Sequence, residues 1–409
     1  MKKYVFALGR DSLLSVAEII VYLESKGIEF NLSETQADAV LIESDKINPA
    51  KLMHDLGGTV KIAEVLFEGK NLQEVFEQAK KKELTEWMNE KFCFSLNFYG
   101  RELKEKNSVE EFFRKEFREQ RKKAVYKKPK KYGKTGFNSS PSQVHSWNLI
   151  EEKSDFVFFN SGKIFFGITI ECFNPKELKK RDELRPAQKK LHSVSLRLAR
   201  ILINLTGVKE GQTLLDPFCG IGSILQEAMF NKINAIGVEL DEETAGNARK
   251  NLEWFEKNYR TEMKWKIIQG DSALIKETLQ GKKFDAVASE PFLGPLIKRT
   301  PKEAEAKKLM QELRQLYSSF FRKLGLIVSD QRIAIILPSI ECSNGKTIEL
   351  DEKVFSDYFK SVNPIKKINE NAFPYNYMEK ESRIKRKIYL LEKNRQTNSL
   401  KEKSTYWKK

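Results

Sequence analysis

The chain has 409 residues, more than one ordinary domain core holds, so we expect two or three domains. It has 73 lysines and arginines against 57 acidic residues, which gives a formal net charge of +16. A basic excess of this size indicates an anionic partner, and nucleic acid is the one we expect. An anionic membrane is the rival, but no apolar run is long enough to span one, so we expect no membrane partner.

The cysteines and histidines indicate the compartment. Four cysteines and three histidines are scattered along the chain without a C-x-x-C pair. This spacing argues against a disulfide framework and against a zinc site, and it is typical of reduced thiols in the cytosol. We therefore expect a cytoplasmic monomer without a metal. The N-terminal sequence MKKYVFALGRDSLLS lacks a small-residue cleavage site, so it predicts a first strand instead of a signal peptide.

The first stretch alternates between strand-like and helix-like patterns. In chain order these segments are a strand at 3–9, a helix at 12–27, and strands at 38–44 and 58–67. Such an order predicts a small α+β domain over residues 1–69. Charged residues with helical spacing follow, and we interpret residues 70–90 as a helical connector.

A second small α+β domain is predicted over residues 91–178. It begins with an apolar strand, and Phe112, Phe113 and Phe117 then fit one face of a helix. The sequence SSPSQVHSWNLI predicts a short helix with a serine cap, and a hairpin should turn at residues 160–162.

Basic side chains crowd the helix of this domain and the segment after it. Few acids offset them, and Tyr126 and Tyr132 lie among the lysines. A solvated helix face is the alternative for such a run, but phosphate attraction with base stacking suits this composition better. The residues that we assign to RNA binding are Arg121, Lys127, Lys128, Lys130, Lys131 and Lys134.

The pattern changes again toward the C-terminus. A helix that Gly207 stops is followed by strand-like and helix-like segments in strict alternation. This rhythm predicts a doubly wound α/β domain of the Rossmann-like kind, with a largely parallel sheet, over residues 179–395. A basic tail, 396–409, follows.

The segment TLLDPFCGIGSILQEA (213–228) is the most informative in this domain. A strand delivers Asp216 at its carboxyl end, and a tight turn with Gly220 and Gly222 opens the next helix. A dinucleotide site would want a third glycine where Leu225 stands, and Asp216 would repel a pyrophosphate. S-adenosylmethionine fits better, because it carries an ammonium and a sulfonium and no phosphate.

Acidic residues also end the next two strands. Glu239 is placed to accept hydrogen bonds from ribose hydroxyls, and Asp271, followed by Ser272, is placed near an adenine amino group. For any one of these residues, capping of the following helix is the alternative. Because successive strand ends all deliver acids to one edge of the sheet, we favour a cofactor pocket.

The fourth strand ends in FDAVASEPFLG (284–294), which brings Glu290, Pro291 and Phe292 beside the expected sulfonium. Methyl transfer to an exocyclic amine needs acceptors for the amine hydrogens, which a carboxylate and a backbone carbonyl supply. Phe292 could hold the target base by stacking. A plain turn at the end of the strand is the alternative for this segment alone.

These motifs resemble the THUMP-domain RNA methyltransferases, and among them the tRNA guanosine N2-methyltransferases that act at position 10. The resemblance rests on LLDPFCGIGSILQEA with RDELRP and LARILINLTG before it, and more loosely on YVFALGRDSLLSVAEI and SSPSQVHSWNLIEEKSDFVFF. It implies an N-terminal ferredoxin-like domain, a THUMP domain and a methyltransferase domain. It also implies that Asp216, Phe218, Gly220 and Gly222 contact the methionine part of the cofactor and that tRNA is the partner.

The fourth-strand motif departs from the family pattern, Asp-Pro-Pro-Tyr-Gly. Aligned without gaps, EPFLG (290–294) keeps an acid as Glu290 but has Leu293 in place of the tyrosine. In a second alignment the aromatic slips by one residue, Phe292 takes the tyrosine position, and Ser289 takes that of the acid. N2-methylguanosine formation in tRNA is the expected reaction. Methylation of another RNA base amine or of rRNA, and an inactive RNA-binding scaffold, stay open as alternatives.

Overall fold

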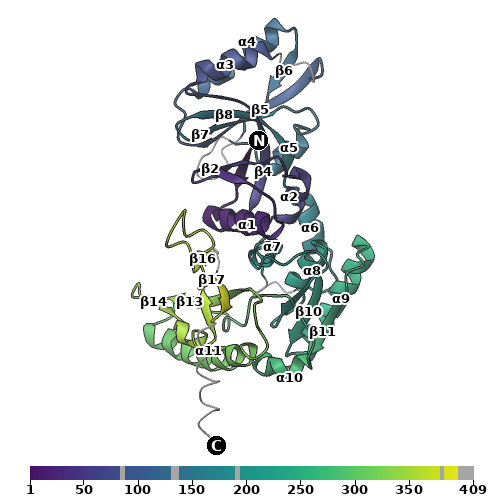
Figure 1. Cartoon of the computed structure of the whole chain (residues 1–409), viewed down its shortest axis with the longest axis vertical. Helices are drawn as coiled ribbons and strands as arrows, with labels where there is room; N and C mark the ends of the chain where they lie inside the picture. Colours follow the sequence, from purple (N-terminus) through teal and green to yellow (C-terminus); the bar gives the residue numbers. More distant parts are fainter. Residues whose placement is uncertain (83–87, 130–137, 189–193, 378–381, 395–409) are drawn as a thin grey trace, which may run out of the picture. The chain divides into compact units, whose positions relative to one another are not determined.

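The computed structural model describes residues 1–82, 88–129, 138–188, 194–377 and 382–394 (Figure 1). The chain divides into two compact units, Met1–Val16 with Gly27–Lys180, and Ala17–Lys26 with Arg181–Lys409. Each unit carries its own sheet. The basic tail expected over residues 396–409 lies outside the described residues.

The first unit contains a sheet in the order β2-β3-β1-β4-β8-β7-β5-β6. In chain order up to α3, the elements are β1 (Lys3–Leu8), α1 (Ser12–Ser25), β2 (Asn31–Thr35), β3 (Ala39–Glu43), α2 (Pro49–Asp55), β4 (Thr59–Gly69) and α3 (Leu72–Lys81). The residues of α1 from Ala17 onward belong to the second unit. The remaining elements are β5 (Lys91–Gly100), α4 (Lys106–Glu119), β6 (Lys123–Tyr126), α5 (Pro141–Ser146), β7 (Asp155–Asn160) and β8 (Ile164–Cys172), and α6 (Pro175–Glu183) follows. The expected strands, the serine-capped helix and the hairpin are confirmed, whereas β2 and β6 were not predicted.

This sheet continues across the domain boundary that we expected near residue 69. Strand β4 pairs with β8 in antiparallel register, so strands from both sides of that boundary form one sheet. Within the expected connector, Val75 and Ala79 of α3 pack into the same core cluster as Phe92 and Phe94 of β5. The division into a ferredoxin-like and a THUMP domain therefore stays a prediction.

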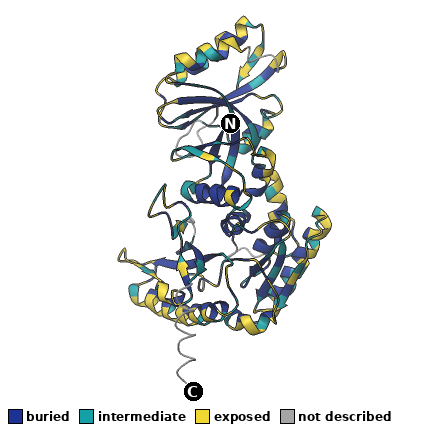
Figure 2. Cartoon of the chain, viewed as in Figure 1, coloured by how far each residue is buried: buried dark blue, intermediate teal, exposed yellow. Residues whose placement is uncertain are grey.

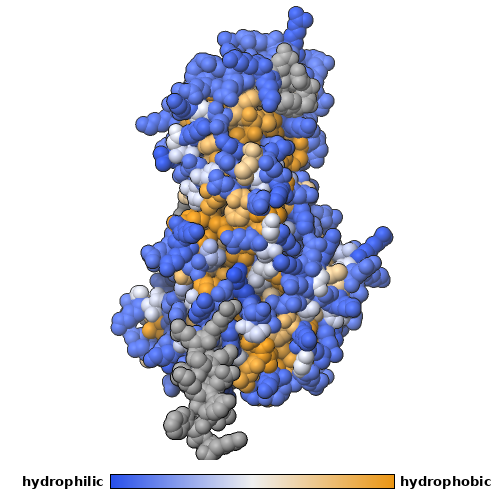
Figure 3. Space-filling model, in the orientation of Figure 1, coloured by the Kyte–Doolittle hydropathy of each residue, from blue (hydrophilic) through white to orange (hydrophobic). Residues whose placement is uncertain are grey.

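Helix α4 presents its phenylalanines to this core, as its spacing predicts. Phe113 and Phe117 are buried, and the ring of Phe113 stacks on Phe156 of β7 with centroids 4.7 Å apart. Phe112 is half-buried and stacks on Phe76 of α3. The opposite faces of α3 and α4 are exposed (Figure 2) and largely hydrophilic (Figure 3). The basic side chains of α4 are thus presented to solvent.

A buried ion pair lies inside the sheet of the first unit. Lys61 of β4 and Asp155 of β7 are 1% and 0% exposed, and Lys61 Nζ lies 2.8 Å from Asp155 Oδ2. Lys61 also donates to Asn97 and Ser139, and Thr169 donates to the carboxylate. Burial alone would raise the pKa of Asp155, but the charge of Lys61 and these hydrogen bonds hold it below its ordinary value. Such a pair fixes one register, because losing either charge would leave the other buried without a counter-ion.

The second unit follows the predicted alternation. Its first elements are α7 (Leu196–Leu205), β9 (Thr213–Asp216), α8 (Ser223–Phe230), β10 (Asn234–Glu239), α9 (Glu242–Tyr259), β11 (Trp265–Gln269), the 3-10 turn η1 (Ser272–Leu274) and α10 (Ile275–Leu279). The later ones are β12 (Ala286–Ser289), α11 (Glu303–Leu324), β13 (Ile333–Glu341), β14 (Thr347–Glu349), the 3-10 turn η2 (Glu352–Val354), β15 (Phe359–Ser361), β16 (Tyr375–Tyr377) and β17 (Ile384–Lys393).

Its sheet runs in the order β11-β10-β9-β12-β13-β17-β15, with β14 paired to β13 and β16 to β17. The strands from β11 to β13 are parallel, and β17 and β15 are antiparallel to their neighbours. The expected doubly wound, largely parallel sheet is confirmed. The order of parallel strands reverses between β9 and β12, and ligands of open α/β sheets bind outside the carboxyl ends of strands at such a point.

A buried cluster of charges fixes α8, the helix that the glycine turn opens. Glu227 is fully buried and pairs with Arg181 at 3.1 Å and with Arg200 at 2.6 Å. Burial would raise the pKa of Glu227, and the two guanidinium groups lower it below its usual value. Arg185 donates to Ser223 at the start of α8. The RDELRP motif (181–186) therefore anchors the helix that carries the glycine turn.

Among the described residues, no helix is both long and apolar enough to cross a membrane.

Candidate functional site

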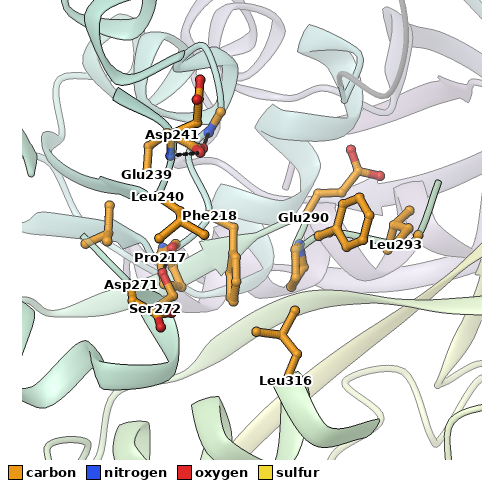
Figure 4. A pocket seen from close by; sticks show the side chains of 15 residues that line it. Pro217, Phe218, Glu239, Leu240, Asp241, Asp271, Ser272, Glu290, Leu293 and Leu316 are labelled. Carbon is orange, nitrogen blue, oxygen red and sulfur yellow. Dashed lines mark hydrogen bonds between the residues drawn. The ribbon is translucent and has the colours of Figure 1, made fainter. Parts of the chain in front are cut away.

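A cavity of about 390 Å³ opens at the carboxyl ends of β9, β10, β11 and β12, within the second unit (Figure 4). Its size suits a small ligand, since ligand pockets span roughly 300–1,000 Å³. The predicted residues that line it are Phe218, Gly220, Glu239, Asp271, Ser272, Glu290, Pro291 and Phe292. Other lining residues include Pro217, Val238, Leu240, Asp241, Leu293, Gly294 and Leu316. Asp216 and Gly222, predicted to touch the cofactor, are not among them.

The glycine turn and the end of β10 are joined through Glu239. Its Oε2 accepts a hydrogen bond from the backbone N–H of Gly220 and its Oε1 from that of Asp241, each at 3.0 Å. Gly220 and Gly222 have φ angles of +54° and +87°, in the left-handed region that glycine adopts without strain. The Glu239 carboxylate is half-exposed at the cavity and keeps lone pairs for further donors.

Asp271 and Ser272 both line the cavity, and both also have local partners. Asp271 Oδ1 accepts from the N–H of Ala273 at 2.8 Å, so Asp271 caps the turn η1 as the alternative interpretation expected. The Ser272 hydroxyl donates to the carbonyl of Pro217. Asp241 in turn caps α9 by accepting from the N–H of Thr244. Capping and ligand contact are compatible here, because a carboxylate offers several lone pairs.

Asp216 lies behind the cavity wall. It is 1% exposed, and its Oδ1 accepts hydrogen bonds from the Ser289 hydroxyl at 2.6 Å and from the Phe218 N–H at 3.1 Å. Burial raises the pKa of Asp216 to about 7; the two hydrogen bonds oppose the rise, and the nearby charges of Glu239 and Glu290 add to it. Asp216 can therefore act on a ligand through its charge and through the turn that it braces.

Glu290 forms an ion pair that the sequence analysis did not predict. The guanidinium Nε of Arg386, on β17, donates to Glu290 Oε1, and the two side chains are only 6% and 8% exposed. Burial raises the pKa of Glu290, and the charge of Arg386 opposes the rise. In Figure 4 the Glu290 carboxylate points away from Glu239. Glu290, the acid that follows the fourth strand, thus lines the cavity, but the positive charge of Arg386 balances its negative charge.

The two aromatic alignments can now be compared with the positions of the side chains. Phe292 lines the cavity and is 57% exposed, whereas Leu293 lines it while only 7% exposed. Ser289 is fully buried and donates to Asp216 instead of facing the cavity. The aromatic ring available to a ligand is therefore that of Phe292.

The lining has one electrostatic character. It combines four acids, Glu239, Asp241, Asp271 and Glu290, with apolar walls, and none of the described residues that line it is a lysine or arginine. Such a cavity suits a ligand with hydroxyl and amino donors and a positive charge, and it disfavours a pyrophosphate. S-adenosylmethionine carries such hydroxyl and amino donors and a positive charge, so the lining residues fit it. In the described part of the chain, no group of three or more His, Cys, Asp or Glu side chains could hold a metal ion.

The residues predicted to bind RNA lie in the first unit. Arg121 and Lys128 are exposed on either side of β6, and Lys127 is half-buried. Tyr126 packs on Phe94 with centroids 5.1 Å apart, and burial raises the pKa of its phenol to about 12. Its ring is partly buried against the core cluster of the first unit, and its stacking on a base stays a prediction. The other predicted residues, Lys130, Lys131 and Lys134, and Tyr132 with them, lie outside the described residues.

Two family models match the chain. The first, described as "RMKL-like, methyltransferase domain", matches residues 184–335, and the second, described as "DNA methylase", matches residues 65–250. Each covers less than half of the chain. The first match includes every residue that lines the cavity, and it ends before Arg386.

Curated relatives are tRNA-modifying enzymes by name. The chain is 31% identical over 178 residues to the tRNA (guanine(10)-N2)-dimethyltransferase of Pyrococcus abyssi, which is 43% of this chain and 48% of that protein. It is 30% identical over 160 residues to the protein of the same name from Methanothermobacter thermautotrophicus, 39% of this chain and 43% of that protein. The matches thus span less than half the length of these relatives.

The fold has a counterpart among solved structures. The crystal structure of TrmN from Thermus thermophilus superposes with a TM-score of 0.52 at 14% identity, covering 96% of this chain and all of that one. At this identity the likeness shows a shared fold. In sequence, the chain is similar to a methyltransferase domain.

Replacing Asp216 with asparagine should make the stability of the protein less dependent on pH. Asparagine keeps an oxygen that can accept from Ser289 but cannot ionise. An unfolded aspartate titrates near pH 4, about 3 units below the folded Asp216, so the folded chain holds more protons between these values. The contribution of Asp216 to stability therefore falls as pH rises from about 4 to about 7.

Thermal unfolding at about pH 5 and about pH 8 measures this difference. The melting temperature of the wild type should drop more between these conditions than that of Asp216→Asn. Asp285→Asn, an exposed acid at the opposite edge of the sheet, serves as the control and should behave as the wild type does. An equal drop in Asp216→Asn and in the wild type would contradict the burial of an ionisable Asp216.

Proposed function

We propose that this protein is an S-adenosylmethionine-dependent methyltransferase that forms N2-methylguanosine in tRNA. The observation that carries the proposal is the acid-lined cavity at the strand ends of a sheet whose residues match a methyltransferase domain model. The substrate follows from relatives named tRNA (guanine(10)-N2)-dimethyltransferases. A cytoplasmic, monomeric state is part of the proposal.

The cofactor would lie along the ends of β9, β10 and β11. Glu239, fixed by two backbone donors, would accept the ribose hydroxyls, and Asp271 would accept from the adenine amino group. Gly220 and Phe218 would border the methionine part, with the charge of Asp216 behind them. Ser272 and Gly222 would act indirectly, Ser272 through its bond to Pro217 and Gly222 by starting α8.

The residues that follow the fourth strand would position the substrate amine and stabilise the charge that develops on its nitrogen. When bound, the cofactor supplies a methyl group activated by a sulfonium; the amine nitrogen gains the methyl carbon and releases a proton to solvent, while sulfur keeps the electron pair. The lone pair of the amine is delocalised into the base, so acceptors for its hydrogens help to aim it. Glu290 and the backbone after Pro291 would be those acceptors, and Phe292 would stack on the extruded base.

RNA would be held in part by the first unit. The exposed Arg121 and Lys128, with Lys127 beside them, offer charges for phosphates, and we extend this surface to Lys130, Lys131 and Lys134. Contacts with phosphates position RNA without reading its sequence. Under this proposal residues 91–178 act as a THUMP domain and residues 1–69 as a ferredoxin-like domain.

Another base amine is the second candidate, and the fourth-strand motif favours it. In the alignment without gaps, Leu293 stands where the family has tyrosine, and it is buried, so the stacking surface would differ from the family pattern. Identification of the product separates the two candidates. The purified chain is incubated with methyl-labelled cofactor and unmodified tRNA, and the labelled nucleoside is identified after digestion.

Label in N2-methylguanosine is the expected result, and Glu290→Ala should abolish it while the variant still binds the cofactor. Label in another nucleoside would show that a different base is the substrate. No label in any RNA, from tRNA or rRNA, would overturn the proposed activity and leave an RNA-binding scaffold.

Reversing charge at the first unit should weaken tRNA binding without touching the cofactor. We expect Lys127→Glu with Lys128→Glu to lower tRNA affinity at least about tenfold and to reduce its salt dependence, because two phosphate contacts are lost. The control is Lys209→Glu with Lys283→Glu, which changes net charge equally but lies before β9 and β12, at the sheet edge opposite the cavity. Equal tRNA affinity of both double variants in a filter-binding assay would exclude the surface.

A further inference from the structure

The loop that follows β12, residues 290–294, is anchored at several points to the C-terminal part of the second unit. Arg386 of β17 donates to the Glu290 side chain, and the Tyr317 hydroxyl of α11 donates to the Phe292 carbonyl at 3.1 Å. A β-carbon on Gly294 would approach Leu309 of α11 to 3.1 Å and Ile384 of β17 to 3.4 Å. Glu290 and Phe292, which line the cavity, are therefore held by hydrogen bonds from β17 and α11.

The sheet register explains how Arg386 reaches Glu290. Ser289, the last residue of β12, pairs with Ile335 of β13, whereas Arg386 pairs with Pro338, three residues further along β13. Strand β13 thus extends past the end of β12, and β17 lies along this extension. Glu290 is the first residue of the loop after β12, and its side chain therefore lies within hydrogen-bonding distance of Arg386 on β17.

Burial makes this pair matter for the charge state of the acid. A carboxylate as buried as that of Glu290 would be costly without a counter-charge, and it would tend to take up a proton. A protonated acid has one oxygen that donates a hydrogen, so it would be a weaker acceptor for the hydrogens of an amine. The guanidinium supplies the counter-charge and is a planar fork of donors, and the hydrogen bond from its Nε to Glu290 Oε1 gives the carboxylate a defined direction.

We infer that Arg386 is a positioning residue for the proposed methyl transfer, acting through Glu290. It holds the Glu290 carboxylate ionised and in one orientation beside the cavity, so that the carboxylate can accept the hydrogens of the substrate amine. This inference rests on the proposed function. Arg386 is not among the residues that line the cavity, so we assign it no contact with the cofactor. It also lies beyond the residues that match the methyltransferase model, 184–335.

A double-mutant cycle tests this role. The four proteins are the wild type, Arg386→Gln, Glu290→Gln and the double variant, each assayed for kcat, for KM toward tRNA and by calorimetry for cofactor affinity. Arg386→Gln should lower kcat about 100-fold, as loss of orientation at a reacting group does, with KM and cofactor affinity within about threefold of the wild type. In the Glu290→Gln background the same change should have almost no further effect, because Arg386 acts through Glu290.

Two further variants separate positioning from general disturbance. Lys387→Gln, the next residue on β17, removes a cation that pairs with Glu349 and should leave kcat unchanged. Arg386→Lys keeps the charge without the fork and should recover part of the lost rate. If Arg386→Gln does not fold, Arg386→Lys decides: kcat lowered about tenfold at an unchanged melting temperature supports the inference, and a wild-type kcat overturns it.

The outcomes distinguish this inference from the function on which it rests. Wild-type kcat in Arg386→Gln, or a full 100-fold loss in both backgrounds, would overturn the role of Arg386 while transfer by the wild type still stands. A wild type that labels no RNA would overturn the proposed function, and this inference with it.

Discussion

The carboxylate of Glu239 joins the two loops that form the near wall of the cavity. By accepting from the N–H groups of Gly220 and Asp241, it ties the glycine turn after β9 to the start of α9. Both loops lie at the point where the strand order reverses, and the sheet leaves a crevice there. The helix α8, fixed by the buried Glu227 with its two arginines, carries the other end of the same turn. The cavity is therefore part of the fold, and a ligand would enter a wall that is already formed.

Acids that look equivalent in the sequence occupy different environments around this wall. Asp216 is buried behind it, and its pKa is raised to about 7, so it can change charge near neutral pH. Glu239 is bound to backbone donors, and Asp271 caps a turn while facing the cavity. Glu290 is neutralised by Arg386. A positive ligand would thus meet acids that differ in burial and in hydrogen-bond partners around one cavity.

Local patterns in the sequence were enough to predict the strands of the second unit and the edge where the acids meet, because hydrophobic alternation and strand ends are short-range signals. The same local patterns could not predict contacts between distant segments. Arg386 lies 96 residues after Glu290, and only the antiparallel register of β17 brings them together. The pairing of β4 with β8, which makes one sheet where we expected a domain boundary, is equally non-local. Asp216 was expected to contact the cofactor, but its side chain turns toward Ser289 behind the cavity wall, and the sequence does not show this orientation.

If this acidic edge receives a positively charged methyl donor, titration calorimetry of the full chain will detect the binding. We expect saturable binding of S-adenosylmethionine and no binding of NAD, whose pyrophosphate the acids repel. Glu239→Gln should weaken the affinity for S-adenosylmethionine at least about tenfold, as expected when hydrogen bonds to a charged group are lost. Glu256→Gln, on the outer part of α9, should bind as the wild type does. No heat with S-adenosylmethionine, or equal affinity in Glu239→Gln, would contradict the account.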